Sequence, residues 1–162
     1  MNDLWRETFV QYSQTSTHKA RVSDARATIR EALANDRCYV SYSGGKDSTA
    51  MLHLVLEQSP QVLVVHWDYG PGFMPRDIEQ AIIANAKTIG ATNLRVYTSQ
   101  KYEEFHRPDF AVFAREYIGG VLPRLRSAGY SCSFVGLRAE ESCKRKQRIK
   151  RHEYIVIREA WP

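Results

Sequence analysis

The segment Ser41–Leu52, which reads SYSGGKDSTAML, gathers groups that could bind an anion. Its two glycines remove side chains from a bend, and Ser43, Ser48 and the ammonium group of Lys46 are potential donors. Asp47 adds a carboxylate that could hold Mg²⁺ or orient a donor. A strand pattern precedes the bend and a helix pattern follows it, so backbone N–H groups of a helix start would face the same anion. We interpret the segment as a phosphate-binding loop, the alternative being an ordinary glycine turn.

A second charged group follows a later strand pattern, in the stretch GLRAEESCKRKQR that begins at Gly136. The guanidinium fork of Arg138 could grip phosphate or sulfate oxygens through two hydrogen bonds. The alternative is a solvated helix start with Glu–Arg pairs. Six of the eight residues from Lys144 to Arg151 are basic. Such a run is typical of a solvated surface, and it could also contact a distal phosphate or a nucleic-acid backbone.

Hydrophobic patterning shows which elements would position these groups. Strands are predicted at 38–42, 61–67, 93–99, 132–138 and 154–158, and helices at 21–37, 49–58, 75–90 and near 122–129. This alternation predicts an α/β fold with a five-stranded parallel sheet and helices on both faces. Right-handed crossovers would then place the loops after the first, second and fourth strands along one edge. We expect one domain over residues 21–162, preceded by a polar, unpatterned arm over residues 1–20.

Several details of these elements can be checked. The helix at 21–37 should begin with Ser23 as its cap. Gly90 should end the helix at 75–90, in which Pro75 is the first residue, and the pair Gly119–Gly120 should interrupt helical structure. His53 is expected inside the core. The apolar faces are predicted to be Val22, Ala25, Ile29, Ala32 and Leu33 in the first helix and Ile78, Ala81, Ile82, Ala86 and Ile89 in the third.

Composition narrows the class of protein. Apolar residues make up 43% of the 162 residues and the formal net charge is +5, which favours anionic partners without choosing among them. The three cysteines, Cys38, Cys132 and Cys143, form no CxxC or Cys/His cluster, so neither zinc nor a disulfide framework is predicted. No apolar run reaches the length of a membrane span, and the N-terminus lacks a signal-peptide core. We therefore expect a cytoplasmic protein with no membrane association.

Three motifs resemble those of one known family. The loop SGGKDS does not fit the Walker pattern, but it is similar to the PP-loop of the adenine-nucleotide α-hydrolase superfamily. GLRAEES, from Gly136 to Ser142, narrows the resemblance to the branch that contains phosphoadenosine-phosphosulfate (PAPS) reductase. DYGPGFMP after the second strand is similar to the family's Asp-Thr-Gly turn, with Tyr69 in place of threonine. The resemblance spans residues 29–162.

This resemblance implies a Rossmann-like (HUP-type) sheet that binds ATP or a sulfated adenylate. Lys46, Asp47 and Arg138 would be catalytic, with Asp47 as the Mg²⁺ ligand. Adenine would lie near His66, Trp67 and Asp68. The second anion site would consist of Glu141, Ser142 and Arg145. The full set implied for the nucleotide is Ser41, Ser43, Gly44, Gly45, Lys46, Asp47, Ser48, His66, Trp67, Asp68, Gly136 and Arg138.

The sequence also departs from the family. Sulfonucleotide reductases carry a nucleophilic cysteine on a C-terminal tail, whereas this chain stops at Pro162 soon after its last strand. The iron–sulfur branch has a cysteine pair where this chain reads YIGGV. Both differences argue against sulfate reduction and against a cluster.

Three functions remain open at this stage. The first is ATP cleavage between the α and β phosphates with Mg²⁺, which adenylates an acceptor for sulfur or nitrogen transfer. The second is a sulfonucleotide reductase that takes thiols from a protein partner. The third is a non-catalytic nucleotide-binding subunit that docks nucleic acid, or a larger modification enzyme, through residues 144–151.

Overall fold

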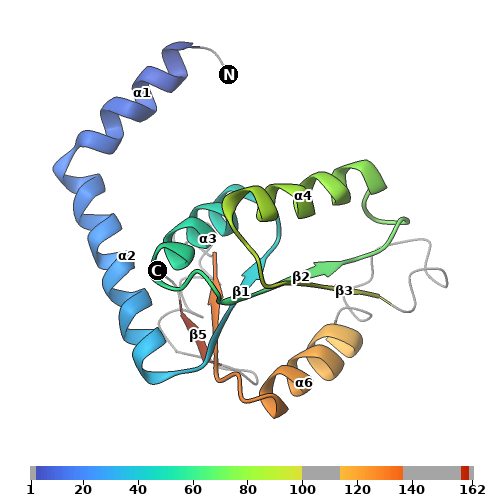
Figure 1. The fold of residues 1–162 in the computed structure, drawn as a ribbon. Coiled ribbons are helices and arrows are strands. Elements are labelled where there is room, and N and C mark those ends of the chain that lie inside the picture. Colours follow the sequence, from blue (N-terminus) through green and yellow to red (C-terminus); the bar gives the residue numbers. More distant parts are fainter. Residues whose placement is uncertain (1–2, 100–113, 137–157, 161–162) are drawn as a thin grey trace.

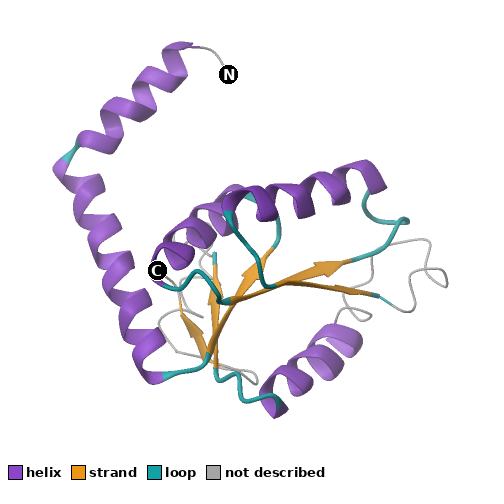
Figure 2. Cartoon of the chain, viewed as in Figure 1, coloured by secondary structure: helices purple, strands orange, loops and turns teal. Residues whose placement is uncertain are grey.

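The computed structural model describes residues 3–99, 114–136 and 158–160. A single parallel sheet lies at its centre, with helices on both sides (Figure 2). The strand order is β3-β2-β1-β4-β5, and every neighbouring pair is parallel. The predicted α/β fold with five parallel strands is therefore confirmed. The strands are β1 (Cys38–Tyr42), β2 (Leu63–Asp68), β3 (Leu94–Thr98), β4 (Cys132–Val135) and β5 (Arg158–Ala160).

The order of the strands reverses beside β1. From β1 the chain moves outward on one side to β2 and β3, and it then returns to place β4 on the other side of β1. In open α/β sheets the crevice outside the carboxyl ends of the strands at such a reversal is the usual place for a ligand. The predicted loop follows β1, and Gly136 follows β4. Both motifs therefore lie at the reversal.

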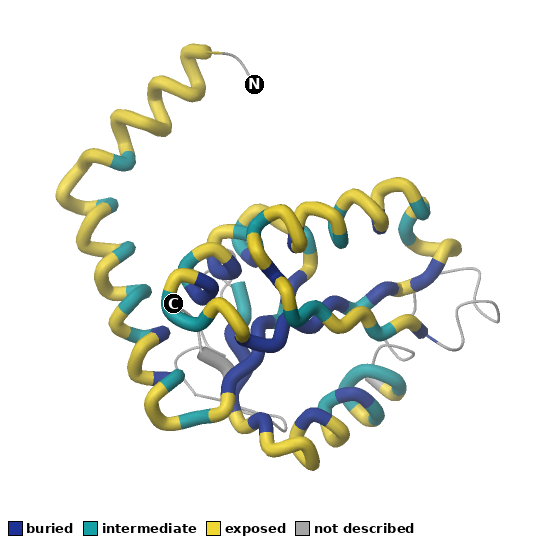
Figure 3. The backbone as a smooth tube through the Cα atoms, viewed as in Figure 1, coloured by how far each residue is buried: buried dark blue, intermediate teal, exposed yellow. Residues whose placement is uncertain are grey.

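Two apolar layers hold the sheet between helices. Side chains from alternate positions of β1 separate them, since Val40 packs with α2, α3 and α4, whereas Tyr39 packs with residues of η1 and α6 (Figure 1). Figure 3 shows the strands at the centre as the buried part of the molecule. The helices are α2 (Ser16–Asn35), α3 (Lys46–Gln58), α4 (Arg76–Ile89), the π-helix η1 (Ala114–Val121) and α6 (Leu122–Ser127).

The apolar face of α4 differs from the predicted one. Ile78 is exposed, and Glu79 is buried in its place on the stripe that continues through Ile82 and Ala86. Ala81 is also exposed, so the prediction was wrong at two positions. The cause is a polar contact inside the core, where Glu79 meets His66 of β2. Gly90 ends the helix in a left-handed conformation, as predicted, and Pro75 is the residue just before its start.

Two expectations about other helices were wrong. His53 of α3 is exposed, because the buried side of that helix is formed by Met51, Leu52, Val55 and Leu56. The glycines at 119 and 120 do not interrupt helical structure, since the π-helix η1 runs through both of them into α6. A π-helix is rare, and the sequence pattern did not predict one here.

The N-terminal arm is helical. Helix α1 (Asp3–Gln14) precedes α2, and Thr15 caps α2 by accepting a hydrogen bond from the His18 amide at 3.2 Å. The expected cap at Ser23 and the expected lack of regular structure before residue 21 were therefore wrong. No residue of α1 is buried. The predicted last strand at 154–158 shares only Arg158 with the described β5, and residues 154–157 lie outside the described part of the chain.

No helix in the described ranges is both long enough and apolar enough to cross a membrane.

Candidate functional site

The loop after β1 is held by hydrogen bonds between its own serines. Ser48 Oγ donates to the carbonyl oxygen of Gly45 at 3.0 Å, so the hydrogen between the two hydroxyls comes from Ser43, whose Oγ lies 3.0 Å from Ser48 Oγ. Ser43 Oγ also accepts from the Gly45 amide at 3.4 Å. The two serines, predicted as donors to an anion, thus shape the loop. Ser48 is buried in this role.

The two glycines of the loop meet different requirements. Gly44 has a φ of +76°, and a Cβ built on it would lie 2.7 Å from Ile82 Cγ1. Residues with a side chain rarely adopt this backbone conformation, so the position needs glycine both for its φ and for the lack of space. Gly45 has an ordinary φ of −71°, and among the described residues the one atom within 4 Å of a Cβ built there is Ser43 Oγ, at 3.5 Å. The described residues therefore leave space at Gly45 that a ligand could use.

The N-terminus of α3 opens at Gly45. Because glycine is the N-cap, it contributes no side-chain acceptor to the first turn of the helix. First-turn amides have no carbonyl partner within their own helix, and together with the helix dipole they favour an anion. Lys46 is exposed at the same place, and its Nζ lies 2.9 Å from Asp47 Oδ2. An ion pair whose lysine is this exposed contributes little, so the ammonium group of Lys46 can turn toward a ligand.

Gly136 brings the end of β4 against this loop. A Cβ on Gly136 would lie 2.6 Å from the Ser48 nitrogen and 2.8 Å from the Asp47 carbonyl carbon. These atoms are backbone and cannot rotate away as a side chain would. The carboxyl end of β4 and the first turn of α3 are therefore in direct contact, and two of the three sequence motifs meet in space.

Ser41 and His66, both expected near the nucleotide, have partners inside the protein. Ser41 Oγ lies 2.8 Å from Ser133 Oγ of β4. Buried His66 places Nδ1 at 2.8 Å from the Tyr42 carbonyl oxygen and Nε2 at 2.6 Å from Glu79 Oε1. A carbonyl only accepts, so Nδ1 carries a hydrogen, and one further proton is shared between Nε2 and Glu79. Both ring nitrogens of His66 are thus engaged in fixing the end of β1.

Asp68 holds the start of the next loop. Arg76 donates to it through both terminal nitrogens, at 2.8 Å and 3.0 Å, and the Gly70 amide donates at 2.7 Å. Burial acts to raise the pKa of Asp68, but the hydrogen bonds from Arg76 and Gly70, with the charge of Arg76, outweigh it and keep the pKa below its ordinary value. Asp68 is therefore an ionised anchor for the loop.

That loop presents two aromatic rings at the same edge of the sheet. Tyr69 and Phe73 are 39% and 43% exposed, and their ring centroids lie 4.8 Å apart. Beneath them Trp67 meets Tyr69 edge-on, at 6.2 Å between centroids, and it meets Tyr117 of η1 at 5.4 Å. Phe73 was not singled out by sequence reasoning, although an aromatic residue in a Gly/Pro loop after a strand is a signal that could have found it.

The remaining predicted site residues, Arg138, Glu141, Ser142, Arg145 and the basic run at 144–151, lie outside the described residues. Within the described ranges, no three His, Cys, Asp or Glu side chains are grouped so that they could hold a metal. Asp47 is a single, partly exposed carboxylate beside the loop. It fits Mg²⁺ of the kind that proteins hold through one or two carboxylates and the phosphates of a substrate.

Comparison with known families agrees with this geometry. A family model described as the phosphoadenosine phosphosulfate reductase domain matches residues 37–161. The chain belongs to this family. It is thus a member of the PP-loop adenine-nucleotide α-hydrolase-like superfamily, in its PAPS reductase branch, and the loop at 43–48 lies in the matched region. A search of curated proteins found no match.

Proposed function

We propose that this PAPS reductase-family protein binds ATP at the loop after β1, cleaves it between the α and β phosphates, and adenylates an acceptor. The observation that carries the proposal is the contact of Gly136 with the Ser48 backbone, which joins the ends of β1 and β4 around an uncapped helix start. Such a start attracts phosphate. Among the described residues, only Ser43 Oγ would contact a Cβ on Gly45, and this supports a phosphate at that position.

Each group has a defined role in this reaction. A nucleophile on the acceptor forms a bond to the α-phosphorus, the bond from that phosphorus to the bridging oxygen breaks, and pyrophosphate leaves with the electron pair. Negative charge grows on the leaving group, where amides of the α3 start and the ammonium group of Lys46 stabilise it. Mg²⁺, held by Asp47 and the phosphates, would neutralise phosphate charge. Arg138, two residues after Gly136 in the sequence, would bind the phosphates from the β4 side.

We place the adenine beside a pair of aromatic rings in the loop after β2, and not beside His66 and Asp68 as expected from the sequence. His66 and Asp68 are occupied by Glu79, Tyr42, Arg76 and Gly70. Tyr69 and Phe73 lie at the same edge with exposed rings, and stacking on aromatic rings is a common way to hold a base. We therefore place the adenine against Tyr69 and Phe73.

Sulfonucleotide reduction is the competing function, since the family description names PAPS. It needs a cysteine that reaches the sulfur. The two described cysteines, Cys38 and Cys132, are buried and paired in register at the amino ends of β1 and β4. Ser43 lies five residue steps after Cys38, and at about 3.3 Å for each step along a strand the two are roughly 16 Å apart. Neither of these two cysteines can act at the loop, so sulfate reduction there would require Cys143, which lies outside the described residues, or a thiol of a protein partner.

The first test is a ligand panel followed by product analysis. ATP with Mg²⁺, AMP and sulfated adenylates are compared by thermal shift, and a ligand at a hundred times its dissociation constant should stabilise the fold by about 2.7 kcal/mol. AMP and pyrophosphate are then measured with candidate acceptors. Lys46→Ala should reduce turnover about a hundredfold, while Lys87→Ala, on the exposed last turn of α4, should not. Sulfite release from a sulfonucleotide, or binding of ATP without turnover, would overturn the proposal.

A further inference from the structure

Helix α1 exposes a continuous apolar face. Leu4, Trp5, Phe9 and Tyr12 are between 46% and 66% exposed, and their spacing of three to four residues places them on one side of the helix together with Thr8. The rings of Trp5 and Phe9 lie 6.3 Å apart between centroids. Figure 3 shows α1 exposed along its length, away from the buried sheet. A face this apolar is typical of an interaction surface.

The helix needs a partner for its own stability. It has 12 residues, and isolated helices of this length are marginal in water because nucleation is costly. Tyr12 contacts His18 of α2 edge-on, with centroids 5.2 Å apart, yet no residue of α1 is buried. Contact with α2 alone therefore leaves most of the apolar face in water.

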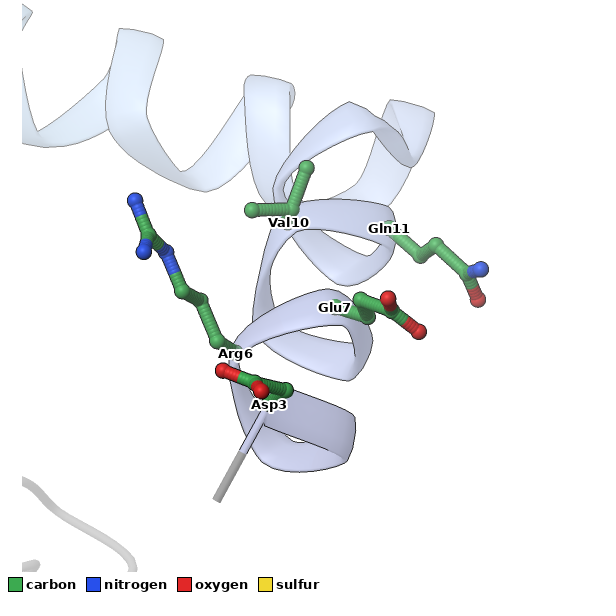
Figure 4. A pocket seen from close by; sticks show the side chains of 5 residues that line it. All are labelled: Asp3, Arg6, Glu7, Val10 and Gln11. Carbon is green, nitrogen blue, oxygen red and sulfur yellow. The ribbon is translucent and has the colours of Figure 1, made fainter. Parts of the chain in front are cut away.

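The opposite side of α1 does not form a ligand site that could stabilise the helix. Figure 4 shows a hollow there, lined by Asp3, Arg6, Glu7, Val10 and Gln11. All five of these residues come from one helix, so the described part of the chain supplies no facing wall that could enclose a ligand. Val10 lines this hollow together with four charged or polar residues, so it lies on the polar side of the helix.

The charge of α1 narrows the classes of partner that its apolar face could bind. The charged residues of α1 are Asp3, Arg6 and Glu7, which give a net charge of −1 (one positive, two negative), and none lies on the apolar face. Helices that lie in a membrane interface carry Lys and Arg on the polar side, and nucleic acid is bound by basic residues. An acidic helix suits neither. An uncharged apolar face suits another protein surface of the same kind.

We propose that α1 pairs antiparallel with α1 of a second copy of this chain through Leu4, Trp5, Phe9 and Tyr12. A twofold axis near Thr8 places Leu4 of one copy opposite Tyr12 of the other, so a single face is complementary to itself, as in most homodimers. Opposed helix dipoles favour this direction. Because α1 extends from the body of the molecule, antiparallel pairing keeps the two bodies at opposite ends of a helix pair about 18 Å long (Figure 1).

The area is sufficient for a modest dimer. An aromatic side chain buries about 200 Å², so the half-exposed rings of Trp5, Phe9 and Tyr12, together with Leu4, offer about 400 Å² per copy. Two copies would bury about 800 Å², which is below the 1,000 Å² or so of a stable specific interface and in the range of weak, transient ones. Association should therefore depend on protein concentration.

Sedimentation velocity of the full chain over a concentration series tests this pairing. The wild-type protein should shift from monomer to dimer, Phe9→Asp should remain a monomer, and Val10→Asp should dimerise like the wild type. Phe9 and Val10 are neighbours with similar exposure, 58% and 55%, and receive the same new residue, so a general effect on helix stability would affect both. A wild-type monomer at all concentrations, a dimer that survives Phe9→Asp, or equal loss in both variants would overturn the inference.

A vesicle assay tests the competing partner. Anionic and neutral phospholipid vesicles should leave wild-type protein in the supernatant, and sedimentation with either kind would contradict pairing as the role of this face. The thermal shift with ATP is measured on Phe9→Asp as well. It should match that of the wild type, so a failure of the dimer is distinguishable from a failure of the proposed ATP site.

Discussion

Ile82 of α4 fills the space beside the α-carbon of Gly44, leaving no room for a methyl group. The same helix reaches the end of β1 twice more, since Asn85 Nδ2 donates to the Tyr42 hydroxyl at 3.0 Å and Glu79 holds the His66 ring that meets the Tyr42 carbonyl. Tyr42 immediately precedes the loop. Helix α4 therefore supports the loop after β1.

Replacing each of the two loop glycines by alanine should affect a different property of the protein. Gly44→Ala should lower the free energy of unfolding, because the left-handed backbone alone costs about 1–2 kcal/mol and overpacking against Ile82 adds about 1–3 kcal/mol. Gly45→Ala should fold normally but lose the stabilisation by ATP, since its methyl would occupy the space proposed for a phosphate. Urea unfolding with and without ATP measures both. Equal destabilisation by the two changes would contradict the assignment.

Gly136→Ala should separate the two motifs. Its methyl would meet the backbone of Asp47 and Ser48, so the first turn of α3 must shift, at a cost of about 1–3 kcal/mol. We expect reduced stability and little ATP binding even where the variant is folded. The control is Gly120→Ala, whose methyl would lie 3.9 Å from the Arg115 carbonyl oxygen and have room. ATP binding by Gly136→Ala at wild-type affinity would remove the observation on which the proposed function depends.

Phe73→Ala should weaken binding of the base and not of the phosphates. Base stacking is worth about 1–3 kcal/mol, so the affinity for ATP should fall roughly 5- to 150-fold. Inorganic tripolyphosphate should bind wild type and variant alike. Phe73→Tyr, which keeps a ring, should retain most of the affinity. If tripolyphosphate affinity falls as far as ATP affinity, the ring acts on the shape of the loop and not on the adenine.

The sequence predicts the parallel sheet, and the edge at which its loops lie, for a physical reason. The positions of the strands follow from local patterns and the shared edge follows from the handedness of crossovers, whereas Gly44 and Gly136 are informative because small residues mark close approaches of backbone. What it cannot show is which polar groups find each other inside the core. From the sequence alone Glu79 is expected on the surface, because nothing in the pattern indicates its contact with His66, 13 positions earlier.

The N-terminal helix was missed for a related reason. Residues 3–14 carry an apolar face of only one and a half heptads, interleaved with Thr, Ser and Gln, and no core lies beneath it to confirm the pattern. Hydrophobic periodicity predicts a helix best when one face of that helix is buried, and this face is not buried within the chain.

Replacing Glu79 should show whether its contact with His66 matters. Glu79→Ala removes the partner of a buried ring nitrogen and should cost about 1–3 kcal/mol of unfolding free energy. Glu79→Gln should cost less, because its amide can donate to Nε2 while Nδ1–H still donates to Tyr42. Both are measured by urea unfolding, together with ATP affinity. Identical losses in the two variants would mean that packing volume, and not the hydrogen bond, is what Glu79 contributes.

Asp68 should make the free energy of unfolding depend on pH in the acidic range. Burial alone would raise its pKa, but Arg76 and the Gly70 amide hold the folded-state pKa below the value of about 3.9 in an unfolded chain. The stability that Asp68 contributes is therefore fully present above about pH 4, and it is lost as the pH falls through the lower, folded-state pKa. Asp68→Asn should lower stability at pH 7, and it should flatten the fall in unfolding free energy between about pH 5 and pH 2.

The control for this profile is Asp24→Asn on the exposed side of α2, which should follow the wild-type curve. Unfolding free energies from urea titrations at each pH give the comparison, and the difference between wild type and Asp68→Asn isolates this one carboxylate from the others. The two curves should converge at the acid end, because a protonated Asp68 no longer pairs with Arg76. Curves that stay parallel down to pH 2 would show that the Asp68–Arg76 fork contributes no pH-dependent stability, and the loop that carries Tyr69 and Phe73 would then need another anchor.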